Sequence, residues 1–307
     1  MKRLCPLSLA AAAILACTAC NYHKVIERES LGEYFRMPQE TSNVYADKVF
    51  EYTPAPGQFI GEPTITEYPI RTPEAACAWA KDRLDGKKFV SLGGFGGYIV
   101  VGFDHSIVAM DGYDFAVYGN AVSGGSEPGI VWVMQDANGN GQPDDVWYEL
   151  RGSESFAQDV IRPYSVTYYR PDGPGQDVRW SDSEGAEGTI DYLGAYHKQD
   201  SYYPGWITAD QYTLTGTRLK AHNFDQSGNG SMWINPDYAW GYADNFGSTY
   251  FCIRDAADPS GNPVELKYID FIKVQTALNT KSGWIGENST EVLGFEDISI
   301  NYYLALP

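Results

Sequence analysis

A loop rich in side-chain oxygens, residues 136–145, is the segment whose residue types and spacing point most directly to chemistry. It reads DANGNGQPDD, with oxygen-bearing side chains at its first, third, fifth and ninth positions. Calcium-binding loops present ligands in that order, and glycines let the short backbone curl around a hard cation. The predicted metal ligands are Asp136, Asn138, Asn140 and Asp144. We expect a structural calcium ion here, and the alternative is an ion-free Asn/Asp/Gly turn.

The segments on either side of this loop are apolar and β-prone, at residues 129–134 and 146–150. An EF-hand carries a bidentate glutamate at the twelfth loop position, but this position is Trp147 here. The loop is therefore not part of a helix-loop-helix EF-hand. Glu149 or more distant residues would have to complete the ligand shell. A second polar segment, 255–262, is either another cation loop or a turn.

Aromatic residues gather between positions 202 and 240, many of them beside Gly, Pro, Asn or Asp. Aromatic faces with interspersed polar groups bind a sugar ring or a flat macrocycle, because they bury apolar area while polar edges fix orientation. The alternative is that these rings pack within the protein. The predicted ligand-binding residues are Tyr202, Tyr203, Trp206, Trp233, Tyr238 and Trp240.

Catalytic motifs are scarce. The sequence contains neither an H-E-x-x-H zinc motif nor a G-x-S-x-G nucleophile motif. We expect Asp104 and His105 to form a structural hydrogen bond. A carboxylate pair for glycoside cleavage is defined by its separation in space, so the sequence leaves a hydrolase or lyase open as an alternative.

The charge of the chain excludes one class of partner. It has 22 Lys and Arg against 40 Asp and Glu, a formal net charge of −18. Because phosphate backbones are bound by basic surfaces, we expect no nucleic-acid partner.

The elements that must position these groups are mainly strands. Short apolar runs separated by Gly, Asn, Asp and Pro follow one another from residue 89 onward, and residues 72–84 form the one convincing helix. This pattern predicts an all-β protein, a jelly-roll-like β-sandwich with long loops and one short N-terminal helix. Strands are expected at 49–52, 98–103, 113–118, 130–134, 146–150, 164–169, 211–219, 250–254, 268–274 and 298–304, whereas 171–210 has no clear period.

The N-terminus has the pattern of a lipoprotein signal peptide. Lys2 and Arg3 precede an apolar run at 4–16, which is too short to span a bilayer. Cys17, after a lipobox-like sequence, is the expected lipidation site, with Cys20 as the alternative and a simply cleaved signal peptide as a further one. The expected organisation is a signal peptide and lipobox at 1–20, a tether at 21–45 and a single β-sandwich domain at 46–307. Cys77 and Cys252 form a disulfide or remain free thiols.

Several blocks of the chain carry a family resemblance. The blocks are KVFEYTPAPGQF (48–59), LGGFGGYIVVGFDH (92–105), GYDFAVYGN (112–120), residues 126–153, WGYADN (240–245), IDFIKVQT (269–276) and GWIGENSTEV (283–292). With these blocks, from about residue 46 to the C-terminus, the chain resembles the "cell surface protein" lipoproteins of gut Bacteroidota. This resemblance implies a jelly-roll lipoprotein anchored to the outer membrane by lipid alone and exposed at the cell surface. The chain lacks acidic residues between Thr18 and Lys24, so a periplasmic orientation stays open.

Some relatives in this family are similar to surface lipoproteins that bind cobalamin. The first expectation is therefore a non-catalytic lipoprotein that captures cobalamin or a related corrinoid for a TonB-dependent transporter. The alternative is a glycan-binding lipoprotein of a polysaccharide uptake system.

Overall fold

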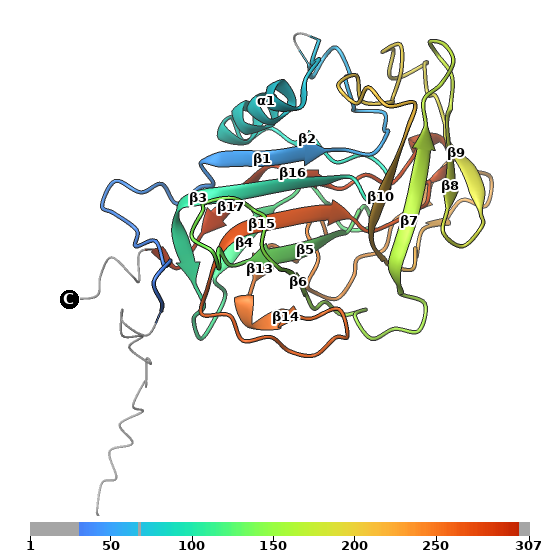
Figure 1. Ribbon diagram of the computed structural model, residues 1–307. Helices are drawn as coiled ribbons and strands as arrows, with labels where there is room; N and C mark the ends of the chain where they lie inside the picture. Colours follow the sequence, from blue (N-terminus) through green and yellow to red (C-terminus); the bar gives the residue numbers. More distant parts are fainter. Residues whose placement is uncertain (1–30, 67–68, 301–307) are drawn as a thin grey trace, which may run out of the picture.

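The computed structural model describes residues 31–66 and 69–300 (Figure 1). The expected signal peptide, with Cys17 and Cys20, lies outside the described residues. Within the described part of the chain, no helix combines the length and hydropathy needed to cross a membrane.

The centre of the fold is a six-stranded antiparallel sheet, in which β15 lies between β3 and β5. These middle strands carry β-branched and aromatic residues and are buried along most of their length, as expected for strands covered on both faces. The strands, in spatial order, are β1 (Lys48–Thr53), β3 (Tyr98–Val108), β15 (Tyr268–Thr276), β5 (Gly129–Met134), β6 (Trp147–Leu150) and β14 (Ala256–Ala257).

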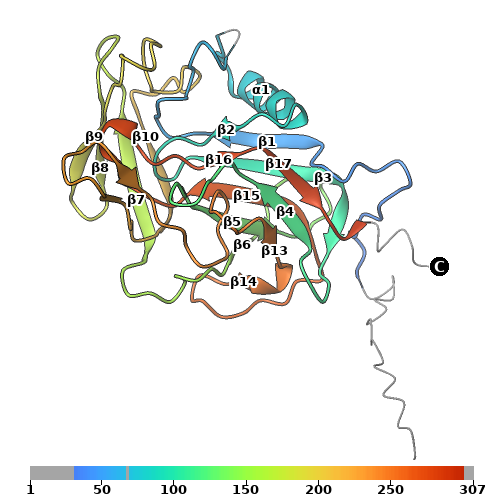
Figure 2. The same cartoon turned by 180° about the vertical axis from the view of Figure 1, so that it is seen from behind.

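A three-stranded sheet packs against one face of the central sheet (Figure 2). It consists of β13 (Tyr250–Phe251), β4 (Phe115–Tyr118) and β17 (Gly294–Asp297). The main core lies between the two sheets and includes a stacked pair, Phe115 and Phe251, with ring centroids 5.5 Å apart. The expected all-β class is confirmed; the jelly-roll connectivity stays a prediction.

A four-stranded sheet stands beside the central sheet, at the right of Figure 1. Its order is β10 (Gln211–Arg218), β7 (Ile161–Tyr169), β8 (Val178–Asp182) and β9 (Glu187–Ile190). A second core lies under it, in which the Tyr168 hydroxyl donates to the Phe95 carbonyl at 2.8 Å. The sequence missed β8 and β9 because most of their residues are exposed or half-buried and polar, so no strict alternation marks them.

The expected helix is confirmed as α1 (Pro73–Asp85), which covers β1 (Figure 1). The Thr72 hydroxyl accepts a hydrogen bond from the Ala75 N–H, and proline occupies the first turn, where its missing N–H costs nothing. The remaining elements are short: β2 (Val90–Ser91) pairs with β16 (Glu291–Val292), β11 (Phe224–Asp225) pairs with β12 (Trp233–Ile234), and two 3₁₀ turns are η2 (Ile253–Asp255) and η3 (Gly283–Ile285).

Two expectations are corrected at the ends of the described chain. Residues 31–45, assigned to a tether, instead pack on the domain: Leu31 is buried against Val108, and the Arg36 guanidinium donates to the Phe103 carbonyl at 2.8 Å. The strand expected at 298–304 is absent from residues 298–300, and the edge strand β17 ends just before them. The last part of that expected strand lies outside the described residues.

Asp270 in β15 ties this N-terminal segment and the 136–145 loop to the central sheet. Its carboxylate accepts hydrogen bonds from Arg36 at 3.0 Å, from the Ser106 hydroxyl at 2.6 Å and from the Asp136 N–H at 2.7 Å. Burial raises the pKa of Asp270, and these donors oppose that shift. Three separate segments therefore depend on one buried carboxylate.

Asp270→Ala is expected to lower the free energy of unfolding by about 3 kcal/mol, because buried donors lose their acceptor. Asp85→Ala is the control, since its ion pair with Lys81 is solvent-exposed and is worth little. Urea unfolding followed by circular dichroism measures both variants. Equal midpoints for the two would contradict the role of Asp270.

Candidate functional site

A cleft of about 490 Å³ lies on the outer face of the central sheet. Three side chains from neighbouring strands form the floor of the cleft. Lys273 of β15 lies opposite Trp132 of β5, and Trp132 lies opposite Glu149 of β6, so all three side chains project from the same face of the sheet. Residues 215–217 of β10, residues 162–163 of β7 and the segment 257–261 form the walls of the cleft. The cleft therefore lies where the two larger sheets meet.

An ammonium group lies among aromatic rings in this cleft. The Lys273 Nζ is 4.6 Å from the ring centroid of Trp132, 5.1 Å from that of Trp147 and 6.0 Å from that of Tyr98. Among the ion pairs of the described residues, none involves Lys273. Burial lowers the pKa of Lys273 to about 8, and the charges of Glu51 and Glu149 oppose that shift. The group is thus mainly charged at neutral pH.

Three residues that line the cleft each have one buried polar atom without a hydrogen-bond partner among the described residues. These atoms are Trp132 Nε1, Arg151 Nε and Gln275 Oε1. Buried polar atoms are usually paired, so atoms of this kind gathered at one cavity favour a polar ligand or ordered water there. At the rim, the Phe156 side chain is 75% exposed and adds an apolar face.

The Glu149 side chain lines the cleft and is held there by two partners. Its carboxylate pairs with the Arg162 guanidinium at 2.7 Å and accepts from the Thr217 hydroxyl. The suggestion that Glu149 completes the shell of the 136–145 loop is therefore wrong, because this carboxylate is already held by partners on β7 and β10.

The six aromatic residues predicted to bind ligand do not form one surface. Tyr202 and Tyr203 lie in the core under the four-stranded sheet, Trp206 in the main core and Tyr238 in a third core cluster. Each is at most 6% exposed, so none offers a ring face to a ligand. These four rings pack within the protein, which is the alternative to a ligand surface that the sequence left open.

The last two of the six are accessible to different degrees. Trp233 in β12 is half-buried, and its indole N–H has no partner. Trp240 is 48% exposed and lines a second cavity of about 280 Å³ with Tyr113 and Tyr250. Arg151 lines both this cavity and the larger cleft, so the two adjoin.

The 136–145 loop brings three of its four predicted ligands, Asn138, Asn140 and Asp144, into contact. The side-chain amides of Asn138 and Asn140 donate to Asp144 at 3.1 and 2.9 Å, while Asp136 accepts from the N–H groups of Gly139 and Gly141 at 2.7 and 2.8 Å. Asp136 is buried and the other three are exposed. The loop is thus a compact polar turn in which calcium remains a proposal.

Other sequence candidates have structural roles. Asp258 accepts from Ser260 and Asn262 within its own turn, which is the arrangement of a simple loop. His105 is buried between Asp104 at 2.6 Å and Asp297 at 2.9 Å, as the structural interpretation expected. Cys77 and Cys252 are free thiols.

Comparisons with known proteins add no assignment. No protein-family model matches the chain, and a search of curated proteins found no match.

The sequence did not single out the residues that line the cleft or those of a second, buried polar site. Lys273, Trp132 and Trp147 lie on three strands, and only the register brings them together. One signal was present: a lysine within the apolar run of a central strand is unusual and needs a reason. The second site consists of Glu127, Asp244 and Glu291.

Asp144→Ala is expected to remove one bound calcium ion per chain, because it deletes the carboxylate on which the loop amides converge. Equilibrium dialysis with radioactive calcium counts the ions. Asp172→Ala, in another exposed turn, is the control and leaves the count unchanged. An unchanged count for Asp144→Ala would mean that the loop is only a turn.

Proposed function

We propose that the protein is a non-catalytic binding protein that holds an acidic glycan in the cleft. The observation that carries this proposal is the Lys273 ammonium, which forms no ion pair with the described residues and lies beside the rings of Trp132 and Trp147. Sugar rings stack on aromatic faces through their C–H groups. A uronic acid adds a carboxylate, which forms a charge-assisted hydrogen bond with an ammonium group.

The size of the cleft supports a short saccharide. Its volume of about 490 Å³ lies in the usual range for small-molecule sites. The indole N–H of Trp132 and the guanidinium of Arg151 are donors for ring hydroxyls, and Gln275 Oε1 is an acceptor. A ligand with many hydroxyl groups would form hydrogen bonds with these donors and this acceptor, whereas an apolar ligand would leave them without partners.

A longer glycan would extend from the cleft past Arg151 to Trp240. Both cavities include Arg151, and the exposed rings of Trp240, Tyr113 and Tyr250 line the second one. Trp240 is thus the one residue of the predicted aromatic set that this proposal retains as a ligand contact.

The cellular setting in the proposal follows from the sequence. The lipobox and the resemblance to Bacteroidota surface lipoproteins support an outer-membrane lipoprotein. Its partner in uptake would be a TonB-dependent transporter.

Cobalamin is the second candidate ligand. Its phosphodiester is an anion suited to the same Lys273 ammonium, and the resemblance to cobalamin-binding relatives supports it. The whole corrinoid is larger than a drug-sized ligand, so it would rest on the rim near Phe156 and place only part of itself in the cleft.

A hydrolase is less well supported by the carboxylates of the cleft. Glycoside cleavage needs a protonated acid, whose pKa is raised, beside an ionised carboxylate. Glu149 pairs with Arg162, and hydrogen bonds from Asn262 lower the pKa of Asp258. Asp258 is therefore ionised at neutral pH, and the Glu149 carboxylate is held by the Arg162 guanidinium, so neither is suited to donate a proton.

Lys273→Met is expected to weaken binding of oligogalacturonate at least tenfold, because one charge-assisted hydrogen bond is lost. Wild-type affinity should also fall as the pH rises through about 8, since the Lys273 ammonium loses its proton there. Lys81→Met, on α1, is the control. Isothermal calorimetry at pH 6.5 and 9 measures both effects.

Equal affinity of Lys273→Met and wild type would contradict the acidic-glycan proposal. Binding of cyanocobalamin, with no heat from any glycan, would favour the second candidate. Turnover of a polysaccharide that stops in Glu149→Gln would support a hydrolase.

Trp240→Ala is expected to lower affinity for a long oligogalacturonate several-fold and to leave that for a disaccharide unchanged, because only the longer chain reaches the second cavity. Trp284→Ala, which removes another exposed ring, is the control. The same loss for both chain lengths would contradict an extended site.

A further inference from the structure

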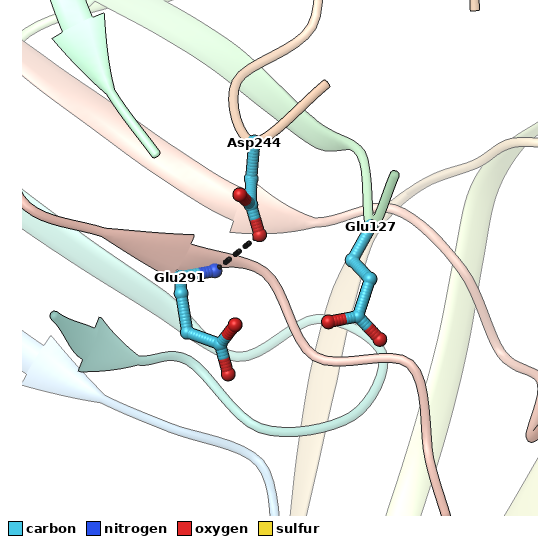
Figure 3. Close-up of side chains that lie close together, drawn as sticks. All are labelled: Glu127, Asp244 and Glu291. Atoms are coloured by element: carbon cyan, nitrogen blue, oxygen red, sulfur yellow. Dashed lines mark hydrogen bonds between the residues drawn. The ribbon is translucent and has the colours of Figure 1, made fainter. Parts of the chain in front are cut away.

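Three carboxylates meet inside the protein, away from the cleft and from the 136–145 loop. Glu127 precedes β5, Asp244 lies in the loop after Trp240, and Glu291 belongs to β16. One oxygen from each lies within 4.8 Å of the others, and Figure 3 shows the three groups turned toward a common space. Asp244 is 1% exposed and Glu291 4%, whereas Glu127 is half-buried.

The hydrogen-bond donors around this carboxylate cluster are neutral, and a fourth carboxylate, that of Glu287, adds to the negative charge near Glu127. Asp244 accepts from the backbone N–H groups of Asn120 and Ala121 at 3.0 Å and from that of Glu291 at 2.8 Å (Figure 3 shows the last). Glu291 accepts from the Ser289 hydroxyl at 3.0 Å. None of the ion pairs within residues 31–66 and 69–300 involves the three carboxylates.

The asparagine beside the cluster supplies an independent indication of a ligand. The Asn288 side chain is 1% exposed and lies against Glu127, with its Nδ2 3.1 Å from Glu127 Oε1. Its Oδ1 is buried without a hydrogen-bond partner. Rotating the Asn288 side-chain amide by half a turn would place Oδ1 where Nδ2 now lies, beside the Glu127 carboxylate. An amide oxygen beside carboxylates is a fourth hard ligand.

Electrostatics makes an ion-free cluster costly. Burial raises the pKa of Glu127 and Asp244 well above their ordinary values and that of Glu291 to about 7. Three like charges at this separation repel one another strongly where water is excluded. Either protons or a cation must offset that repulsion.

We propose that Glu127, Asp244 and Glu291, with the Asn288 amide oxygen, form a buried site for a hard divalent cation, with calcium as the preferred ion. Carboxylate and amide oxygens are the ligands of calcium, and the absence of His and Cys from the group disfavours zinc and copper. Oxygens up to 4.8 Å apart fit around an ion with calcium–oxygen distances of about 2.4 Å.

The site joins segments that are distant in sequence. Asp244 contacts the chain just after β4, Glu127 leads into β5 and Glu291 pairs with β2 through β16. Asp244 itself has φ of +50°, a left-handed conformation that is costly for a residue with a side chain. A bound ion would hold the loop in this conformation and connect both faces of the sandwich.

The test uses the full chain carrying Asp144→Ala, so that the 136–145 loop contributes no ion. Calcium is added to protein stripped with EGTA, and calorimetry and mass-spectrometric metal analysis count the bound ions. We expect one ion per chain, a higher melting temperature with calcium than with EGTA, and loss of both effects on adding Glu127→Gln.

Asp114→Asn is the matched control, because it removes the charge of a buried carboxylate outside the cluster and keeps an oxygen acceptor for the Met110 N–H. It should retain the ion. No bound ion in the Asp144→Ala protein would overturn the proposal, and that measurement does not require a cluster variant to fold. An ion retained by Glu127→Gln and by Glu291→Gln would also overturn it. A rise in melting temperature for Glu127→Gln in EGTA, together with calcium-independent melting of the parent, would show that protons occupy the cluster.

Discussion

The repulsion among Glu127, Asp244 and Glu291 is the constraint on which the arrangement of the sandwich depends most. A chain with a net charge of −18 brings together three carboxylates, two of them buried and that of Glu127 half-buried, and none of them forms an ion pair within the described residues. Backbone N–H groups from distant segments donate to Asp244 and Glu127, and the nearby Ser289 hydroxyl donates to Glu291, so moving one side chain to relieve the repulsion would break these hydrogen bonds. A cation in this space would convert the repulsion into a cross-link between strands that are distant in sequence.

The two faces of the central sheet differ in composition and in what covers them. Its inner face is apolar and packs against the three-stranded sheet and α1. Its outer face carries Lys273, Trp132 and Glu149 in one row, and the four-stranded sheet covers only part of that face. The cleft therefore results from incomplete coverage of a sheet whose outer side chains are polar and aromatic.

Fold class and the position of α1 could be predicted from the sequence because periodicity, proline and the Thr72 cap are local signals. The strands at 178–182 and 187–190 could not, since they are polar and mostly accessible. Aromatic density between 202 and 240 suggested a ligand surface, yet Tyr202 and Trp206 are buried, because composition does not tell which face of a long loop meets the core. Lys273 and the carboxylate cluster depend on pairing between remote segments, which no local pattern encodes.

A crystal structure of the calcium-loaded protein, with anomalous diffraction recorded at a long X-ray wavelength, tests the cation centre most directly. The expected result is an anomalous peak bonded to oxygens of Glu127, Asp244 and Glu291, with the Asn288 amide turned to present Oδ1. A structure without that peak, in which carboxylate oxygens approach one another at the short distances of shared protons, would contradict a cation at this position.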